Sequence, residues 1–168
     1  MRARLAAAVL AFTTIAAAAG AATTLKPVHA DGFSMSVPSD WRVLKNIGTV
    51  ELYAISTKMD GSFRVNANVV VTPSQSGFPT SWRSAMLKEL AKAGIKVSSL
   101  STRNVSLPAG SAVELRYQGT MLGRRLQWLA YVFQAPSRTY VVTFTSAQTS
   151  YARYAPLFRT MARTFRIG

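Results

Sequence analysis

The sequence predicts an α/β domain built as an α/β/α sandwich, with a mainly antiparallel central sheet, one mid-chain helix and one C-terminal helix. Two observations predict it. Strand-like alternation recurs through residues 33–72 and 96–146, while apolar residues recur at helical spacing in 78–93 and 149–165. Residues 125–134 are apolar on both strand faces, which is typical of a strand covered on both sides. A chain of 168 residues with 49% hydrophobic content suits a single domain.

The first thirty residues have the pattern of a secretory signal peptide. Arg2 and Arg4 give a cationic start, residues 5–22 are uncharged and mostly apolar, and Val28-His29-Ala30 puts small residues at the two positions that a signal peptidase reads. We therefore expect cleavage near Ala30, a domain over residues 31–168, and a secreted or periplasmic protein of the cell envelope. A retained membrane anchor is the alternative, because the apolar run approaches the length of a spanning helix.

Four strands are expected at the start of the domain: 33–37, 41–44, 50–57 and 63–72. Alternating apolar residues define the first, and a Pro-Ser-Asp-Trp corner ends it. Asp60-Gly61 lies between the last two strands and is a strong signal for a β-hairpin. In the fourth strand Val65, Ala67 and Val69 share one face, which predicts a half-buried strand.

A helix is expected next, from the capping residues Thr80 and Ser81 to about Ala93, with Gly94 ending it. Its predicted core-facing stripe is Trp82, Met86, Leu90 and Ala93. Four antiparallel strands should follow, at 96–105, 111–119, 125–134 and 139–146. A second helix, from Thr149 to about Phe165, should cover the other face of the sheet. Its predicted stripe is Tyr151, Tyr154, Phe158, Met161 and Phe165.

The residue types present argue against catalysis. The chain has no cysteine, which excludes disulfides, thiol nucleophiles, cysteine-ligated metals and a lipid-modified cysteine. Its single histidine, His29, falls in the expected signal peptide, so a triad that uses histidine as a base is excluded from the mature protein. No cofactor or metal site is expected. A hydrolase remains as an alternative only if Glu51 and Glu114 act as a carboxylate pair in one pocket.

The charge is strongly basic. The 20 Lys and Arg residues face six acids, for a formal net charge of +14, and loss of three cations with the signal leaves +11. Such a surplus attracts anionic surfaces, although a run of charge is often only a solvated face. No nucleic-acid partner is expected for an exported protein. The candidate basic patch comprises Lys88, Lys92, Arg124, Arg125, Arg159, Arg163 and Arg166.

Four segments carry a family resemblance: "FSMSVPSDW", "FRVNANVVVTPS", "FPTSWRSAMLKELAKAG" and "AVELRYQGTMLGRRLQWLAYVFQAPSRTYVVTFTSA". Together they resemble the PsbP-like (Mog/PsbP) sandwich domains, most closely the bacterial extracytoplasmic LpqN/LpqT-type and DcrB-like groups, over residues 31–168. The resemblance implies a non-catalytic binding or accessory domain and carries over no catalytic residues. LpqN-type proteins have a lipid-modified cysteine at the cleavage site, and this chain has none.

The expected function is therefore that of a secreted accessory protein that contacts a partner protein, a lipid or a glycolipid. The alternative is a charge-driven peripheral binder of anionic envelope polymers or phospholipids, and the carboxylate hydrolase is the third hypothesis.

Overall fold

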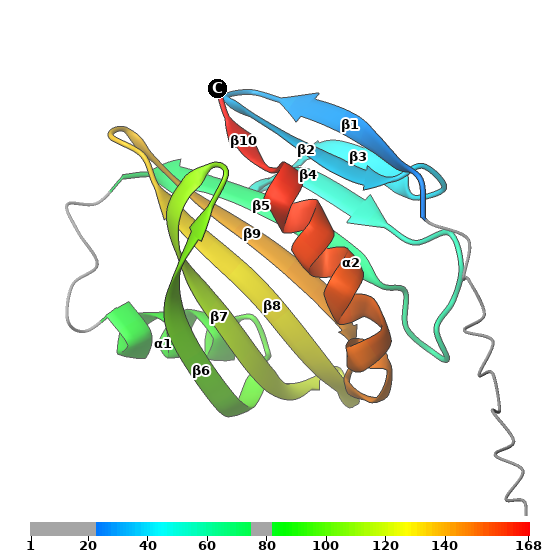
Figure 1. Ribbon diagram of the computed structural model, residues 1–168. Coiled ribbons are helices and arrows are strands. Elements are labelled where there is room, and N and C mark those ends of the chain that lie inside the picture. The colour runs from blue at the N-terminus through cyan, green and yellow to red at the C-terminus, as the bar shows by residue number, and fades with distance from the viewer. Residues whose placement is uncertain (1–22, 75–81) are drawn as a thin grey trace, which may run out of the picture.

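The centre of the molecule is a seven-stranded antiparallel sheet (Figure 1). The computed structural model describes residues 23–74 and 82–168. In spatial order the strands are β3 (Arg42–Ile47), β4 (Val50–Ile55), β5 (Asn66–Pro73), β9 (Arg138–Ala147), β8 (Arg124–Gln134), β7 (Gly110–Met121) and β6 (Lys96–Leu107). All strands predicted after residue 31 are present, with ends shifted by a few residues. The two-residue turns at 48–49, 108–109 and 122–123 join neighbouring strands directly.

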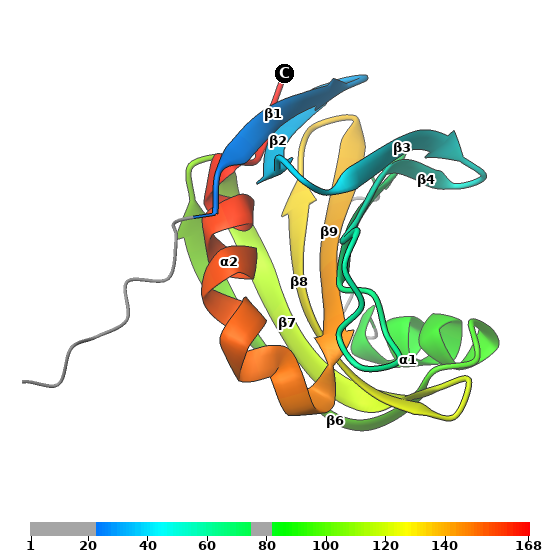
Figure 2. The ribbon, with the colours of Figure 1, turned by 90° about the vertical axis from the view of Figure 1, so that its right-hand side faces the viewer.

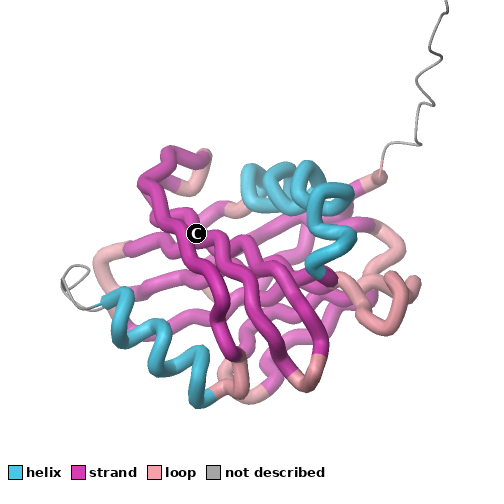
Figure 3. The backbone as a smooth tube through the Cα atoms, turned by 90° about the horizontal axis from the view of Figure 1, so that it is seen from below, coloured by secondary structure: helices cyan, strands magenta, loops and turns pink. Residues whose placement is uncertain are grey.

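One helix lies on each face of this sheet, which confirms the predicted sandwich. Helix α1 (Trp82–Lys92) packs near β6, and helix α2 (Tyr151–Thr164), entered through a short 3₁₀ turn (Gln148–Ser150), packs against β2, β8 and β9. Figures 2 and 3 show the strands between the two helices. The alternation of β8 explains this arrangement. Leu129, Tyr131 and Phe133 join the core under α2, whereas Leu126, Trp128, Ala130 and Val132 join the core under α1.

The two predicted helix stripes are buried to different depths. Under α2, Phe158, Met161 and Phe165 are completely buried and Tyr154 is half-buried. Under α1, Met86 and Leu90 are half-buried against the core, but Ala93 is exposed. The predicted cap at residues 80–81 and the side chain of Trp82 lie outside the described residues. Helix α2 is therefore the main cover of the sheet.

A second, three-stranded sheet includes residues that precede the expected domain start at residue 31. Its order is β1 (Leu25–Ala30), β2 (Phe33–Pro38) and β10 (Arg166–Ile167). All six residues of β1 pair with β2, and Val28 is buried in the core. Pro27 is tolerated because β1 is an edge strand. The paired strands thus include residues 25–30, and cleavage at the expected boundary after Ala30 would remove β1.

The pairing of β1 bears on two expectations of the sequence analysis, the absence of histidine and the net charge of the folded chain. His29 lies exposed on β1, so the folded domain does contain an imidazole. Lys26 also stays, and the formal charge of residues 23–168 is +12, because only Arg2 and Arg4 of the 20 cations precede them.

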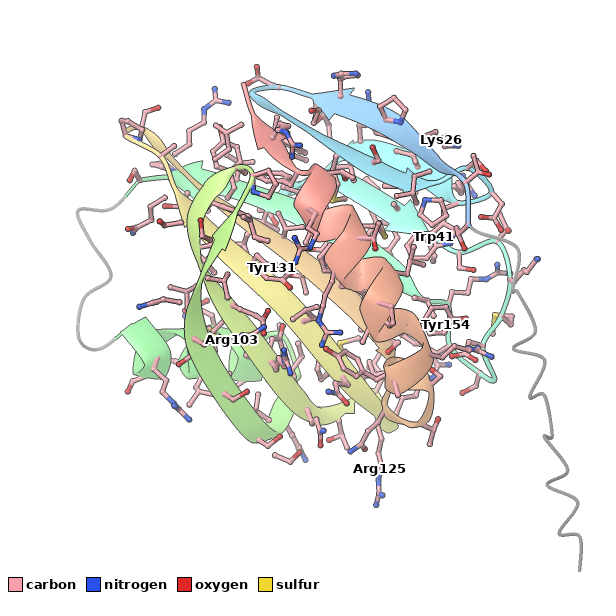
Figure 4. All side chains as sticks on the ribbon, viewed as in Figure 1. Lys26, Trp41, Arg103, Arg125, Tyr131 and Tyr154 are labelled. Atoms are coloured by element: carbon pink, nitrogen blue, oxygen red, sulfur yellow. The ribbon has the colours of Figure 1, made fainter. Side chains whose placement is uncertain are left out.

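The Pro-Ser-Asp-Trp corner ends β2, as the sequence predicted, and also links the two sheets. The Trp41 amide donates to the Pro38 carbonyl at 3.0 Å, and Lys26 Nζ donates to the carbonyl of Ser39 at 3.0 Å. Trp41 itself is buried in the core (Figure 4). The corner therefore turns the chain from β2 into β3 and seats an aromatic anchor at the junction.

Gly119 permits a close approach between β6 and β7. A Cβ atom at this position would lie 2.3 Å from the carbonyl oxygen of Lys96, beside the irregularity in β6 between Val97 and Ser99. We expect Gly119→Ala to lower the free energy of unfolding by about 1–3 kcal/mol, because the backbone must move to admit the methyl group. Urea unfolding measures the change. Ser111→Ala, at an exposed position of the same strand, should change stability by less than about 0.5 kcal/mol. Equal stability of the two variants would contradict this explanation.

Candidate functional site

The α2 side of the sheet becomes polar where it extends past the helix. Strand register places Arg103 of β6 opposite Glu114 of β7, and Glu114 opposite Tyr131 of β8. Paired residues in neighbouring strands lie on one face, so these three side chains form a row across the sheet. Arg116 lies two residues beyond Glu114 and therefore shares its face.

Glu114 is the centre of this cluster and is only 3% exposed. Arg103 donates through Nε to Oε1 and through Nη2 to Oε2, each at 2.9 Å, which is the two-pronged geometry preferred by guanidinium and carboxylate groups. Arg116 Nε donates to Oε1 at 2.8 Å, and the Tyr131 hydroxyl donates to Oε2 at 3.0 Å. Figure 4 labels Arg103 and Tyr131 on their strands. We call Arg103, Glu114, Arg116 and Tyr131 the Glu114 cluster.

The electrostatics of the cluster keep Glu114 ionised. Burial alone raises the pKa of this carboxyl group, but hydrogen bonds from Arg103 and Tyr131 and the charges of Arg116 and Arg103 outweigh it, so the net pKa is lowered. Burial and the neighbouring carboxylate raise the pKa of Tyr131. Its hydroxyl group therefore stays protonated and donates a hydrogen bond to Glu114. With both oxygens accepting hydrogen bonds, Glu114 is a poor proton donor and a poor base. Its chemical effect is to orient the two arginines.

A small cavity opens beside these arginines. It has a volume of about 140 Å³ and is lined by Ser101, Thr102, Arg103, Glu114 and Arg116. Residues of α2 complete the surroundings. Arg159 lies close enough to lower the pKa of both Tyr131 and Tyr151 by its charge, against the upward effect of burial on each phenol. Arg103 and Arg116 thus contact Glu114 directly, and the charge of Arg159 acts on the Tyr131 hydroxyl group that donates to the same carboxylate.

The candidate basic patch is not brought together on one surface. Lys88 and Lys92 lie on α1, on the opposite side of the sheet from α2, and Lys92 pairs with Glu89 at 2.7 Å. Arg124 and Arg125 are exposed at the turn between β7 and β8 (Figure 4 labels Arg125). The remaining members, Arg159, Arg163 and Arg166, lie along α2 and β10.

Only Arg159 of that patch lies next to the Glu114 cluster. Arg163 is exposed on α2, and its carbonyl accepts a hydrogen bond from Arg166 Nη1 at 2.8 Å. Whether the patch has a function stays a prediction. Arg103 and Arg116 were missed by the sequence analysis, although strand alternation already puts Arg116 and Glu114 on one face.

The carboxylate pair required by the hydrolase hypothesis is separated by the fold. Glu51 lies on β4 and Glu114 on β7, with three strands between them in the sheet. At about 4.8 Å per strand, the two lie on the order of 19 Å apart. A mechanism that needs both carboxylates in one pocket therefore has no geometric basis here.

Two further cavities differ in chemistry from the one at the Glu114 cluster. A cavity of about 290 Å³ has a mixed lining that includes Asp31, Glu51 and Arg138. Another, of about 570 Å³, is lined by uncharged residues: Asn104, Val105, Ser106, Ser111, Ala112, Val113, Val132 and Gln134. Within residues 23–74 and 82–168, no three His, Asp or Glu side chains gather as metal ligands would. None of the helices in this part of the chain has the length and apolar character needed to cross a membrane.

Solved structures similar to this one identify the fold. The solution structure of cyanobacterial PsbP (CyanoP) from Synechocystis superposes with a TM-score of 0.67 at 16% identity, covering 87% of this chain and 94% of that one. The chain has a PsbP-like fold. LpqN of Mycobacterium tuberculosis, described as involved in cell envelope biogenesis, superposes on the PsbP-like domain with a TM-score of 0.57 at 16% identity, covering 86% of this chain and 90% of that one.

A Pseudomonas aeruginosa protein of unknown function has a TM-score of 0.53 to the PsbP-like domain at 15% identity, covering 83% of this chain and 94% of that one. No family model matches the sequence, and no curated protein matches it. At these identities the likeness establishes the fold, which confirms the resemblance found in the sequence.

Proposed function

We propose that this protein is an exported, non-catalytic accessory protein of the bacterial cell envelope that contacts a partner protein, a lipid or a glycolipid. The Glu114 cluster is the observation that carries the proposal. Its buried carboxylate is committed to hydrogen bonds, while the side chains of Arg103 and Arg116 are 59% and 37% exposed. Such an arrangement suits recognition of an anionic group better than bond making. The envelope role given for LpqN supports the setting.

Export is part of this proposal, with a cleavage site earlier than Ala30. Removal of β1 would uncover one edge of β2 and take Val28 out of the core. We therefore place cleavage among the small residues 19–22, after Ala21 or Ala22. Intact-mass analysis of the protein recovered from the periplasm or medium of an expressing bacterium should then give an N-terminus at Ala22 or Thr23. A mature N-terminus at Asp31, or a chain that keeps its first residues, would contradict this placement.

Partner capture tests the role of the cluster. The mature protein is tagged, expressed in its native host and crosslinked in the intact envelope, and bound molecules are identified by mass spectrometry. The double variant Arg103→Gln/Arg116→Gln is compared with Arg42→Gln/Lys45→Gln, which removes the same charge from exposed positions of β3. A molecule kept by the wild type and the β3 variant but lost from the cluster variant supports the proposal. The same molecules on all three proteins would contradict it.

A charge-driven peripheral binder is the second candidate, favoured by the formal charge of +12 over residues 23–168. Binding of that kind depends on the number of charges and weakens steeply with salt. Co-sedimentation with phosphatidylglycerol vesicles should then fall equally for the cluster variant and the β3 variant, and disappear near physiological salt. If only one of the two variants kept its binding to the vesicles, this candidate would be excluded.

A further inference from the structure

We propose that Arg103, Arg116 and Arg159, together with the hydroxyl group of Tyr151, form a binding site for a phosphomonoester group. The proposal rests on the proposed function, because it names the chemical class of ligand that the Glu114 cluster would recognise. The site lies between α2 and the outer strands β6 and β7, where the row of Arg103, Glu114 and Tyr131 crosses the sheet.

Charge selects the class of ligand. Hydrogen bonds join the guanidinium groups of Arg103 and Arg116 to the Glu114 carboxylate, and the charge of Arg159 acts on the Tyr131 hydroxyl group bonded to that carboxylate. With three cations and one anion, this neighbourhood has a formal charge of +2. A phosphomonoester carries a charge of about −1.5 to −2 at neutral pH, whereas a carboxylate or a phosphodiester carries one. Guanidinium groups also match phosphate oxygens geometrically, because they offer paired donors in one plane. A phosphomonoester therefore neutralises the site, and a singly charged anion does not.

The donors needed are already oriented. Arg103 and Arg116 each direct Nε and Nη2 at Glu114. In the part of the chain that the structure describes, the Nη1 groups of both arginines have no hydrogen-bond partner. Glu114 therefore fixes the planes of two guanidinium groups without using all their donors. A ligand that binds to groups held in this way loses less conformational entropy than one that must order flexible arginines.

Tyr151 supplies an independent observation. It is only 9% exposed, and its hydroxyl group is buried without a hydrogen-bond partner among the described residues. A buried polar group of this kind costs free energy until something satisfies it. The charges of Arg116 and Arg159 both act on this phenol. A phosphate oxygen at this point would satisfy the hydroxyl group.

Cavity size limits the ligand to one group of a larger molecule. The cavity of about 140 Å³ is smaller than the 300–1,000 Å³ typical of sites that enclose a whole small molecule. The rest of the ligand would extend over the outer surface of β6 and α2. The cavities of about 570 and 290 Å³ are poorer anion sites, since the first is lined by uncharged residues and the second contains two carboxylates and one arginine.

Titration of the folded protein (residues 23–168) with small anions tests the proposal. The probes are glycerol 3-phosphate, dimethyl phosphate and acetate, followed by calorimetry and by shifts in backbone NMR signals of β6, β7 and α2. We expect glycerol 3-phosphate to bind at least 10-fold more tightly than either singly charged probe. Arg159→Gln should weaken it about 10-fold and Tyr151→Phe about 3-fold. Arg42→Gln should change it less than 2-fold.

Arg159→Gln is the decisive variant, because Arg159 forms no ion pair or hydrogen bond within the described chain and its loss should leave the fold intact. Equal weakening by Arg159→Gln and Arg42→Gln, or dimethyl phosphate binding as tightly as glycerol 3-phosphate, would overturn the phosphomonoester site. If the envelope partner still depends on Arg103 and Arg116 in that event, the proposed function stands and only its ligand class is wrong.

Vesicles distinguish the source of the phosphate group. Phosphatidylcholine vesicles that contain phosphatidic acid present a monoester on a membrane, and phosphatidylglycerol presents a diester. Preference for phosphatidic acid that is lost in Arg159→Gln identifies a lipid headgroup. Binding of glycerol 3-phosphate without any preference between the two vesicles identifies a soluble phosphate ester.

Discussion

Glu114→Gln should lower the free energy of unfolding by about 2–3 kcal/mol at neutral pH. The carboxylate accepts hydrogen bonds from Arg103, Arg116 and Tyr131, and bonds to a charged partner are each worth roughly 1.5–3 kcal/mol on deletion. The loss stays below the sum of these terms, because the two arginines are partly exposed and regain water. Chemical denaturation followed by near-UV absorption or fluorescence measures it.

Glu89→Gln is the matched control for this change. Glu89 also pairs with a cation, Lys92, at 2.7 Å, but its side chain is 68% exposed. Exposed pairs contribute about 0.2–1 kcal/mol, so the control should change stability by less than about 0.5 kcal/mol. Equal losses in the two variants would show that the Glu114 cluster contributes no more than a surface ion pair.

The pH dependence follows from the lowered pKa of Glu114. A carboxyl group whose pKa is lower in the folded state adds stability that is complete above its unfolded pKa of about 4.3 and is lost as pH falls through the folded pKa. The stability difference between wild type and Glu114→Gln should therefore be constant from pH 7 to 5 and narrow below about pH 4. A difference that persists unchanged into acid would contradict the assignment of the effect to an ionised Glu114.

Most elements of the fold were predictable because their signals are local. Apolar alternation marks β2, β5 and β8, and helical spacing marks α1 and α2. Strand β1 was missed for a physical reason. Residues 25–30 contain a proline and follow an alanine-rich leader, so their extended structure depends on pairing with β2 rather than on their own composition. Strand β10 has two residues, too few for any pattern to show.

The Glu114 cluster could be predicted from the sequence, but only by counting the strand register from the turns. The sequence marks both turns with proline or glycine, at Pro108-Ala109 and Leu122-Gly123. Each is a two-residue turn, which makes Leu107 pair with Gly110 and Met121 with Arg124. Counting back from these turns places Arg103 opposite Glu114 and Glu114 opposite Tyr131. Arg159 could not be added in this way, because the position of α2 along the sheet depends on packing between distant parts of the chain.

A chain that begins at Asp31 should be less stable than one that begins at Thr23 by at least about 2 kcal/mol. The shorter chain lacks β1, and with it the burial of Val28, which alone contributes roughly 1.5–3 kcal/mol. It also lacks the bond from the Ser39 amide to the Thr24 carbonyl, 2.9 Å long, and the contacts of Lys26 with the corner. Urea unfolding of the two chains under identical conditions measures the difference.

The shorter chain should also self-associate at lower protein concentrations than the longer chain. Self-association would show that deletion of β1 exposes the edge of β2, in addition to removing buried contacts. Strand β2 lies between β1 and the two-residue β10. Deletion of β1 therefore leaves one edge of β2 without hydrogen-bond partners along its whole length. An uncovered strand of this kind pairs readily with another chain.

Val28→Ala in the longer chain is the control, since it removes buried side-chain volume and keeps the strand. It should lose stability without increased association in light scattering. Equal stability of the two chain lengths would mean that β1 is not part of the cooperative fold, and cleavage at Ala30 would then be compatible with a stable protein.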